Sequence, residues 1–285
     1  MDTAKALDLT AANHRPVGEL GYDDPALAPG RPIVAVPTTA GTGAETNSFA
    51  VITNEAQGRK SYVGHPSLLP QATILDPALT LGLPSGATGA TGIDALTHSL
   101  ESLLSANPNP FAEAVALGVI RTIGEWLPRA VADGSDLEAR SQMLVASHLA
   151  GVGQASGTGV GLVHALGHAI GTRGRLAHGT ALAVVIPQVL AFYFGVRDRE
   201  LALVAVALGV ARPADDERRA ARAAVDAVSG LIDAVGQRRT LHDVGLGPEN
   251  LRVLVDDALD DPAIRNAPRL PTAAEATALL EVVAG

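Results

Sequence analysis

The sequence predicts an α/β fold that is followed by an all-helical part. Short β-type runs occur in the first eighty or so residues, and after Pro84 the chain changes to long Ala-, Leu- and Val-rich segments with helical spacing. Connectors rich in Gly and Pro lie at 15–32 and 82–92, and the second is the natural domain boundary. We therefore expect a partial α/β domain over 1–82 and a helical domain over 83–285.

The individual elements follow from local composition. Strands are predicted at 33–36, 48–53, 60–63 and 72–75. The clearest helical segments are 111–127, 137–153 and 216–235. The opening segment DTAKALDL is helix-like, but the strand that an α/β unit normally places before such a helix is missing. The sequence is thus typical of a chain that begins within a domain.

Composition excludes several classes of function. The net charge is -9 and no Lys/Arg cluster occurs, so we expect no nucleic-acid partner. The absence of cysteine excludes disulfides and means that any metal would be held by nitrogen and oxygen ligands. The first residues do not resemble a secretion signal, and the apolar run at 181–196 is too short to cross a bilayer and is broken by Pro187. We expect no membrane partner and a cytoplasmic location.

The segment GIDALTHSLE (92–101) contains the first pair of candidate metal ligands. Asp94 and His98 stand four residues apart, which on a helix places both side chains on one face. Two such side chains can converge on one ion.

Three more histidines follow in GLVHALGHAIGTRGRLAHG. His164 and His168 repeat the four-residue spacing, and His178 comes after the glycine-broken stretch 171–174, which we expect to be a loop that returns the chain to the same point. A lone histidine on an apolar helix is usually a hydrogen-bonded core residue, and we interpret His148 in that way. The cluster instead favours a site for Fe(II) or Zn(II), built from one carboxylate and two or three imidazoles.

The segment VPTTAGTGAETN (36–47) follows a predicted strand and is rich in small hydroxyl residues and glycine. Such a turn can present backbone N–H groups and threonine hydroxyls to an anionic or polar ligand. Glycine turns also occur wherever a chain must bend. The pattern alone leaves a ligand loop and a plain turn equally open.

Several motifs together resemble the iron-containing, metal-dependent alcohol dehydrogenases. They are VPTTAGTGAET, the DP-x-L-T segment at 76–80, GIDALTHSLE, and H-x3-H-x9-H-G at 164–179. NAPR at 266–269 is also close to an Asn-Pro-Arg motif of that family, with Ala267 inserted. The resemblance implies a dinucleotide-binding α/β domain and a helical metal-binding domain, with metal and nicotinamide between them.

The resemblance also implies roles for individual residues. The metal ligands would be Asp94, His98, His164 and His178. His168 would lie close to the nicotinamide and the substrate, and it is the candidate for relaying a proton. Residues at the cofactor, NAD or NADP, would be Asp2, Thr38, Thr39, Thr42, Lys60 and Thr80.

The chain departs from the family pattern at its start. Family members carry a Gly-Gly-Gly-Ser turn just before the segment that reads MDTAKAL here, and about a hundred residues before that turn, which hold the phosphate-binding glycines. We expect a complete metal site, because every ligand lies downstream of residue 90, and poor nicotinamide binding by this chain alone.

The implied reaction is hydride transfer between a small alcohol and a nicotinamide cofactor, assisted by a divalent metal, with an aldehyde or ketone as the product. One alternative is a hydroxyacid–oxoacid transhydrogenase of the same family, which would take a hydroxy-acid substrate. Another is an inactive, truncated metal-binding fragment. The family commonly forms dimers or larger assemblies, so a homo-oligomer is expected.

Overall fold

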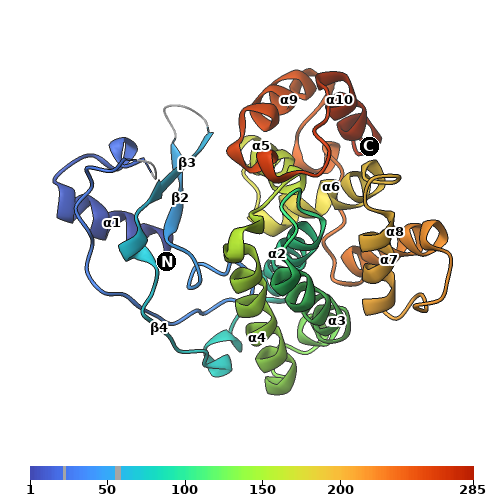
Figure 1. Ribbon diagram of the computed structural model, residues 1–285, viewed down its shortest axis with the longest axis horizontal. Coiled ribbons are helices and arrows are strands. Elements are labelled where there is room, and N and C mark those ends of the chain that lie inside the picture. Colours follow the sequence, from blue (N-terminus) through green and yellow to red (C-terminus); the bar gives the residue numbers. More distant parts are fainter. Residues whose placement is uncertain (22–23, 55–58) are drawn as a thin grey trace.

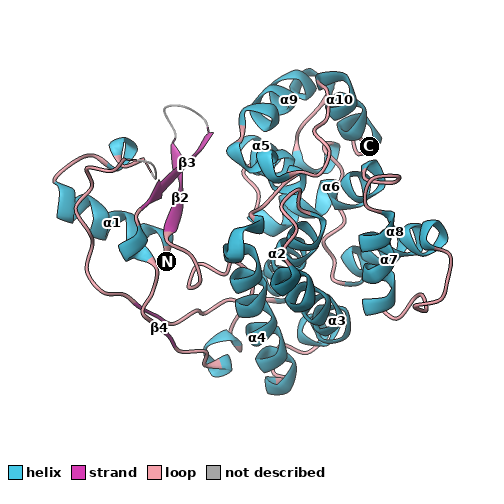
Figure 2. Cartoon of the chain, viewed as in Figure 1, coloured by secondary structure: helices cyan, strands magenta, loops and turns pink. Residues whose placement is uncertain are grey.

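The computed structural model describes residues 1–21, 24–54 and 59–285, and the side chains of residues 53–61 lie outside that description. Figure 1 shows a smaller part, coloured blue to teal, beside a larger group of helices arranged around α2 (Ser85–Leu104). Figure 2 shows that the strands of the described chain lie in the smaller part. The predicted α/β part followed by a helical part is therefore confirmed.

In its described residues, the smaller part contains one helix and two separate strand pairs. Its elements are α1 (Asp2–Asn13), β1 (Val34–Ala35), β2 (Phe49–Asn54), β3 (Arg59–Gly64) and β4 (Ala72–Thr73), with short 3-10 turns at Val17–Glu19, Pro66–Leu68 and Pro77–Thr80. β1 pairs with β4 in parallel, and β2 pairs with β3 as an antiparallel hairpin. Each of the four predicted strands is present, although β1 and β4 are only two residues long.

A buried lysine joins α1 to the segment that precedes the hairpin. The Lys5 ammonium donates hydrogen bonds of 2.6 Å to the carbonyl oxygens of Ala44 and Asn47 and one of 2.9 Å to the Asn47 side chain. A buried cation is tolerated when acceptors replace its water shell. These bonds hold the end of the 36–47 segment against α1.

The β1–β4 pair leaves apolar side chains uncovered. Val34 and Val36 are 62% and 41% exposed, and Ile74, next to β4, is 55% exposed. Interior strands of parallel sheets are normally covered by neighbouring strands and helices. In the described residues this strand pair is therefore left partly uncovered.

The larger part is built from nine described helices. They are α2, α3 (Pro110–Ala132), α4 (Leu137–Gly153), α5 (Leu162–Gly174), α6 (His178–Phe192), α7 (Asp198–Ala207), α8 (Glu217–Ala234), α9 (Leu251–Asp260) and α10 (Ala273–Val282). The predicted segments 111–127, 137–153 and 216–235 correspond to α3, α4 and α8. Among the described residues, no helix has the length and apolarity needed to cross a bilayer.

One local expectation was wrong. Residues 171–174 form the last turn of α5 rather than a loop, and the chain turns at Arg175, which has a φ of 52°. Glycine weakens an isolated helix, but tertiary packing overrides that weak preference. Here a Cβ on Gly171 would stand 3.2 Å from the Ala181 side chain of α6, so the glycine lets the two helices lie close together.

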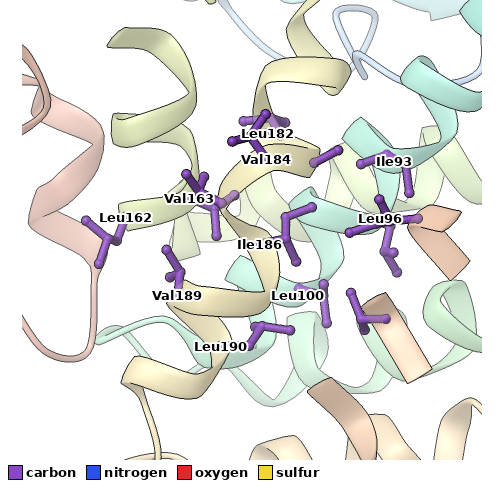
Figure 3. Close-up of a cluster of buried hydrophobic side chains, with 14 of the residues drawn as sticks. Ile93, Leu96, Leu100, Leu162, Val163, Leu182, Val184, Ile186, Val189 and Leu190 are labelled. Atoms are coloured by element: carbon purple, nitrogen blue, oxygen red, sulfur yellow. The ribbon is translucent and has the colours of Figure 1, made fainter. Parts of the chain in front are cut away.

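Helix α2 forms the centre of the core. Every residue from Gly92 to Leu104 is buried, and the helix packs against α3, α4 and α6. Figure 3 shows Ile93, Leu96 and Leu100 of α2 facing the Leu182–Leu190 stretch of α6. A helix that is apolar on most sides is stable only inside a protein. Polar residues on α2 therefore point into a dry interior.

Candidate metal centre

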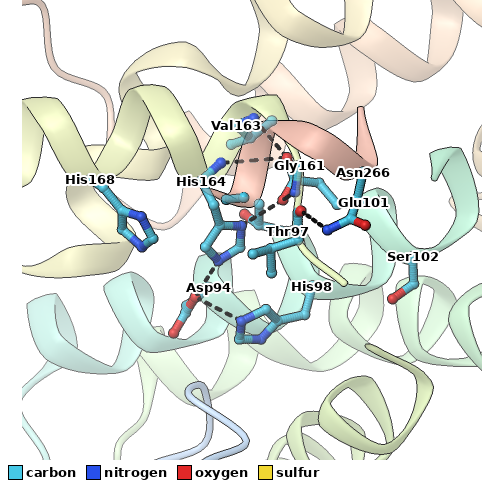
Figure 4. A network of polar contacts seen from close by, with 12 residues as sticks. Asp94, Thr97, His98, Glu101, Ser102, Gly161, Val163, His164, His168 and Asn266 are labelled. Atoms are coloured by element: carbon cyan, nitrogen blue, oxygen red, sulfur yellow. Dashed lines mark hydrogen bonds and ion pairs between the residues drawn. The ribbon is translucent and has the colours of Figure 1, made fainter. Parts of the chain in front are cut away.

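Four side chains from three helices converge beside α2. Asp94 and His98 lie one turn apart on α2, His164 is in the first turn of α5, and His178 is the first residue of α6. Asp94 Oδ1 lies 3.6 Å from His98 Nε2, 3.7 Å from His164 Nε2 and 3.5 Å from His178 Nε2. Figure 4 shows Asp94, His98 and His164 pointing toward one another.

Glycines allow the other segments to approach α2 this closely. A Cβ added to Gly179 would lie only 1.8 Å from the carbonyl oxygen of Ala90, so the start of α6 rests directly on the α2 backbone. One residue further along α2, a Cβ on Gly41 would lie 2.5 Å from the Thr91 carbonyl oxygen. The first contact brings His178 to Asp94, and the second places the 36–47 segment beside the same helix.

The spacing of the ligand atoms suits a bound cation. The candidate atoms of Asp94, His164 and His178 all lie within 4.8 Å of one another. A tetrahedral ion with bonds near 2.1 Å holds its ligand atoms about 3.4 Å apart, which is close to the three separations measured from Asp94. One carboxylate and imidazole nitrogens form a donor set that suits Fe(II) or Zn(II).

Buried polar atoms without partners point to the same conclusion. Among the described residues, Asp94 Oδ1, His98 Nδ1 and His164 Nε2 are buried and have no hydrogen-bond partner. An unsatisfied buried polar atom costs about 1–3 kcal/mol. A divalent cation contacting Asp94 Oδ1 and His164 Nε2 would remove two of these costs, so the residues present fit such an ion.

The electrostatics at the centre keep the carboxylate charged. Burial by itself would raise the pKa of Asp94, but the charges of His98 and His178 and the contact with His164 together hold it below its ordinary value. Burial lowers the pKa of both His98 and His178, against the opposing pull of Asp94. Burial by itself would also lower the pKa of His164, but the carboxylates of Glu101 and Asp94 raise that pKa to about 9.

Glu101 supports His164, a role that the sequence motifs did not predict. Its Oε2 accepts hydrogen bonds from His164 Nδ1 at 2.6 Å and from the Gly161 N–H at 2.7 Å, and its Oε1 accepts from the Val163 N–H at 2.6 Å. These contacts direct His164 Nε2 toward Asp94 (Figure 4). A carboxylate behind a ligating histidine commonly orients it. The available signal was spacing, because Glu101 follows Asp94 by two helical turns.

His168 lies beside the cluster but is held by a different carboxylate. Its ring centre is 5.8 Å from that of His164 and 5.3 Å from that of His178. Its Nδ1 lies 2.7 Å from Oδ2 of Asp261, a residue that the sequence analysis also missed. No motif marked Asp261, because it lies 93 residues after its partner in the chain.

The predicted cofactor residues are spread over the smaller part. Thr38 and Thr42 are exposed in the 36–47 segment, and Thr39 is half-buried. Asp2 accepts a hydrogen bond from the Val51 N–H at 2.9 Å, so one of its oxygens is used in joining α1 to β2.

Two other predicted cofactor residues, Thr80 and Lys60, lie outside the 36–47 segment. Thr80 is buried, its hydroxyl donates to the Pro77 carbonyl at 2.8 Å, and it shares with Ala40 the wall of a cavity of about 10 Å³. It therefore lies behind the 36–47 segment rather than on its surface. Lys60 belongs to β3, but its side chain lies outside the described residues.

His148 and the NAPR motif have structural contacts in the described chain. His148 Nδ1 lies 3.3 Å from Glu45 Oε1, which joins α4 to the 36–47 segment. The Asn266 side chain donates to the Val160 carbonyl at 2.9 Å, and the Asn266 backbone carbonyl accepts from the Ala106 N–H at 2.9 Å. Asn266 therefore supports the turn from which α5 begins.

Comparisons with known proteins agree with this architecture. A family model described as the C-terminal part of the Fe-containing alcohol dehydrogenase family matches residues 88–284, and one described as iron-containing alcohol dehydrogenase matches residues 1–77. The probable alcohol dehydrogenase EutG of Salmonella typhimurium is 40% identical over 96% of this chain and 68% of its own length.

Two further relatives extend the comparison. The NAD-dependent methanol dehydrogenase of Bacillus methanolicus is 36% identical over 95% of this chain and 71% of its own length. The solved structure of an alcohol dehydrogenase from Oenococcus oeni superposes with a TM-score of 0.94 at 30% identity, covering 99% of this chain and 73% of that one.

Proposed function

The chain belongs to the iron-containing alcohol dehydrogenase family, and we propose that it transfers hydride from a small alcohol to NAD, and in reverse reduces the aldehyde or ketone. The observation that supports this proposal is that Asp94 Oδ1 lies within 3.5–3.7 Å of the Nε2 atoms of His98, His164 and His178. A divalent ion bound there, Fe(II) or Zn(II), supplies the Lewis acidity that lowers the pKa of an alcohol hydroxyl.

The remaining roles are assigned to residues around that point. Asp94 contributes the negative charge that attracts the cation, and Glu101 holds the ring of His164 in the binding orientation. His168 is close enough to the cluster to receive the proton that an alcohol gives up, while the hydride goes to NAD.

We place the cofactor against the 36–47 segment, because Thr38 and Thr42 are exposed there and the absence of a side chain at Gly41 lets the segment lie against α2. NAD is preferred to NADP because a relative 36% identical to this chain is named as NAD-dependent. The division into a cofactor domain at 1–82 and a metal-binding domain at 83–285 is part of the proposal. A homo-oligomeric state and a cytoplasmic location stay predictions.

Elemental analysis tests the ligand set directly. The chain should retain about one equivalent of iron or zinc after dialysis, and both Asp94→Ala and His178→Ala should lose most of it. His65→Ala is the matched control, because His65 caps a short turn in the smaller part. Full metal retention by both ligand variants would contradict the assignment.

Turnover assays separate the proposed reaction from its alternatives. Formation of NADH from a small primary alcohol by the metal-loaded chain would support the proposal. Exchange between a hydroxy acid and an oxo acid without added NAD would contradict it and favour a transhydrogenase. Stoichiometric metal binding without either reaction would favour an inactive metal-binding fragment.

A further inference from the structure

Asp261 contacts hydrogen-bond donors from two separate segments. Its Oδ1 accepts from the Ala263 N–H at 2.8 Å, which caps the short turn at Pro262–Asn266. Its Oδ2 lies 2.7 Å from His168 Nδ1 on α5. The side chains of His168 and Asp261 are each only 9% exposed, so water does not compete strongly for this bond.

Tyr62, on the hairpin of the smaller part, contacts the ring of His168. Its ring meets that of His168 edge-on, with the two ring centres 6.4 Å apart. Burial, together with the negative charges of Asp261 and Glu101, raises the pKa of Tyr62, so the hydroxyl keeps its proton. Tyr62 is therefore neutral near the negative charge of Asp261.

These contacts determine which nitrogen of neutral His168 carries the proton. An ionised carboxylate only accepts hydrogen bonds, so the nitrogen that faces it must be an N–H. The proton is then on Nδ1, and Nε2 retains a lone pair. Because Nδ1 and Nε2 lie on different sides of the ring, the lone pair points away from Asp261.

We propose that Asp261 is a positioning residue for His168: it fixes the Nδ1–H tautomer and so keeps Nε2 ready to accept a proton at the metal centre. This inference rests on the proposed function, in which an alcohol O–H proton goes to Nε2 and the hydride goes to NAD.

The structure predicts an unusual outcome for Asp261→Asn. The Ala263 N–H can only donate, so it will retain the amide oxygen and leave the amide NH2 facing His168. An NH2 group cannot accept a hydrogen bond, so His168 Nδ1 must become the acceptor. The proton should therefore move to Nε2, and the tautomer should invert.

Nitrogen NMR of the zinc-loaded, 15N-histidine-labelled chain tests this prediction. The tautomer is read from the neutral form of the ring, and His168→Gln identifies the signals of His168 by their loss. Wild type should show mainly Nδ1–H, and Asp261→Asn mainly Nε2–H, with the tautomer ratio changed by at least roughly tenfold. Asp257→Asn is the matched control, because Asp257 pairs with Arg173 across the same α5–α9 contact and should leave the tautomer unchanged.

Several outcomes would overturn the inference. They are an Nε2–H tautomer in wild type, an unchanged tautomer in Asp261→Asn, or inversion in Asp257→Asn. Tyr62→Phe retains the ring that meets His168 and should keep the Nδ1–H form, because Asp261 Oδ2 still accepts from His168 Nδ1. Zinc content, measured on the same samples, tests the metal site of the proposed function separately, because the tautomer prediction can fail while zinc stays bound.

Discussion

Replacing Gly179 by alanine should displace the start of α6 from α2. The new Cβ would lie 1.8 Å from the Ala90 carbonyl oxygen and 2.6 Å from its carbonyl carbon. A carbon and an oxygen in contact normally stand about 3.3 Å apart, so the backbone must retreat by about 1.5 Å. Neither atom can rotate away, because both belong to helix backbone.

His178 precedes Gly179 and must move with it. Metal–ligand distances are held within about 0.2 Å, so a displacement of this size should remove His178 from the ion. We expect zinc affinity to fall by about 100-fold and the free energy of unfolding of the metal-free chain to fall by about 1–3 kcal/mol.

Chelator competition measures the zinc affinity, and urea unfolding measures the stability. Gly118→Ala is the matched control, since nothing lies within 4 Å of the added Cβ and the site is inside α3. That variant should keep its zinc affinity and gain up to about 1 kcal/mol of stability. A zinc affinity for Gly179→Ala within about twofold of wild type would refute the packing argument.

Three other outcomes are expected. Glu101→Gln should weaken zinc binding by about 10–100-fold, because an amide NH2 cannot accept from the Gly161, Val163 or His164 donors. Lys5→Met should lower the free energy of unfolding by about 2–3 kcal/mol without changing zinc content, because it leaves buried carbonyl oxygens unpaired. The 285-residue chain alone should bind NADH too weakly to saturate, because the β1 edge that carries the exposed Val34 is uncovered.

The two substitutions have matched controls, and each of the three outcomes can be contradicted. Glu138→Gln on α4 makes an equivalent exchange at an exposed site and should leave chelator competition unchanged. Arg31→Met removes an exposed ion pair with Asp8 and should change urea unfolding by less than about 1 kcal/mol. Unaltered zinc affinity in Glu101→Gln, or unaltered stability in Lys5→Met, would show that those contacts are dispensable. Tight, saturable NADH binding would show that the cofactor site is complete.

Much of the fold could be predicted because it depends on local pattern. The strands and the long helices follow from alternation and from helical spacing, as α3 and α4 illustrate. The pairing of Asp94 with His98 was predictable for the same reason, since a four-residue step on a helix has only one geometry. Spacing within one element is therefore the most reliable information in this sequence.

What could not be predicted depends on contacts between distant segments. Glu101 and Asp261 each support a histidine more than sixty residues away along the chain, and a carboxylate that does so looks like any other in the sequence. The helical state of residues 171–174 depends on packing against α6, which local glycine content does not reveal. Thr80 matches a family motif, but its burial behind the 36–47 segment follows only from the folded arrangement.

The residues of α2 make that helix intolerant of any change in length. Asp94, His98 and Glu101 project from it at fixed rotations, with the Ala90 contact behind them. Each residue added to a helix turns everything beyond it by about 100°. Insertion or deletion of a single residue between Ala90 and Glu101 would therefore rotate some of these three side chains away from the metal site. The apolar residues of α2, in contrast, can be replaced one at a time. Over evolutionary time we expect this stretch to vary in composition but to keep a constant number of residues.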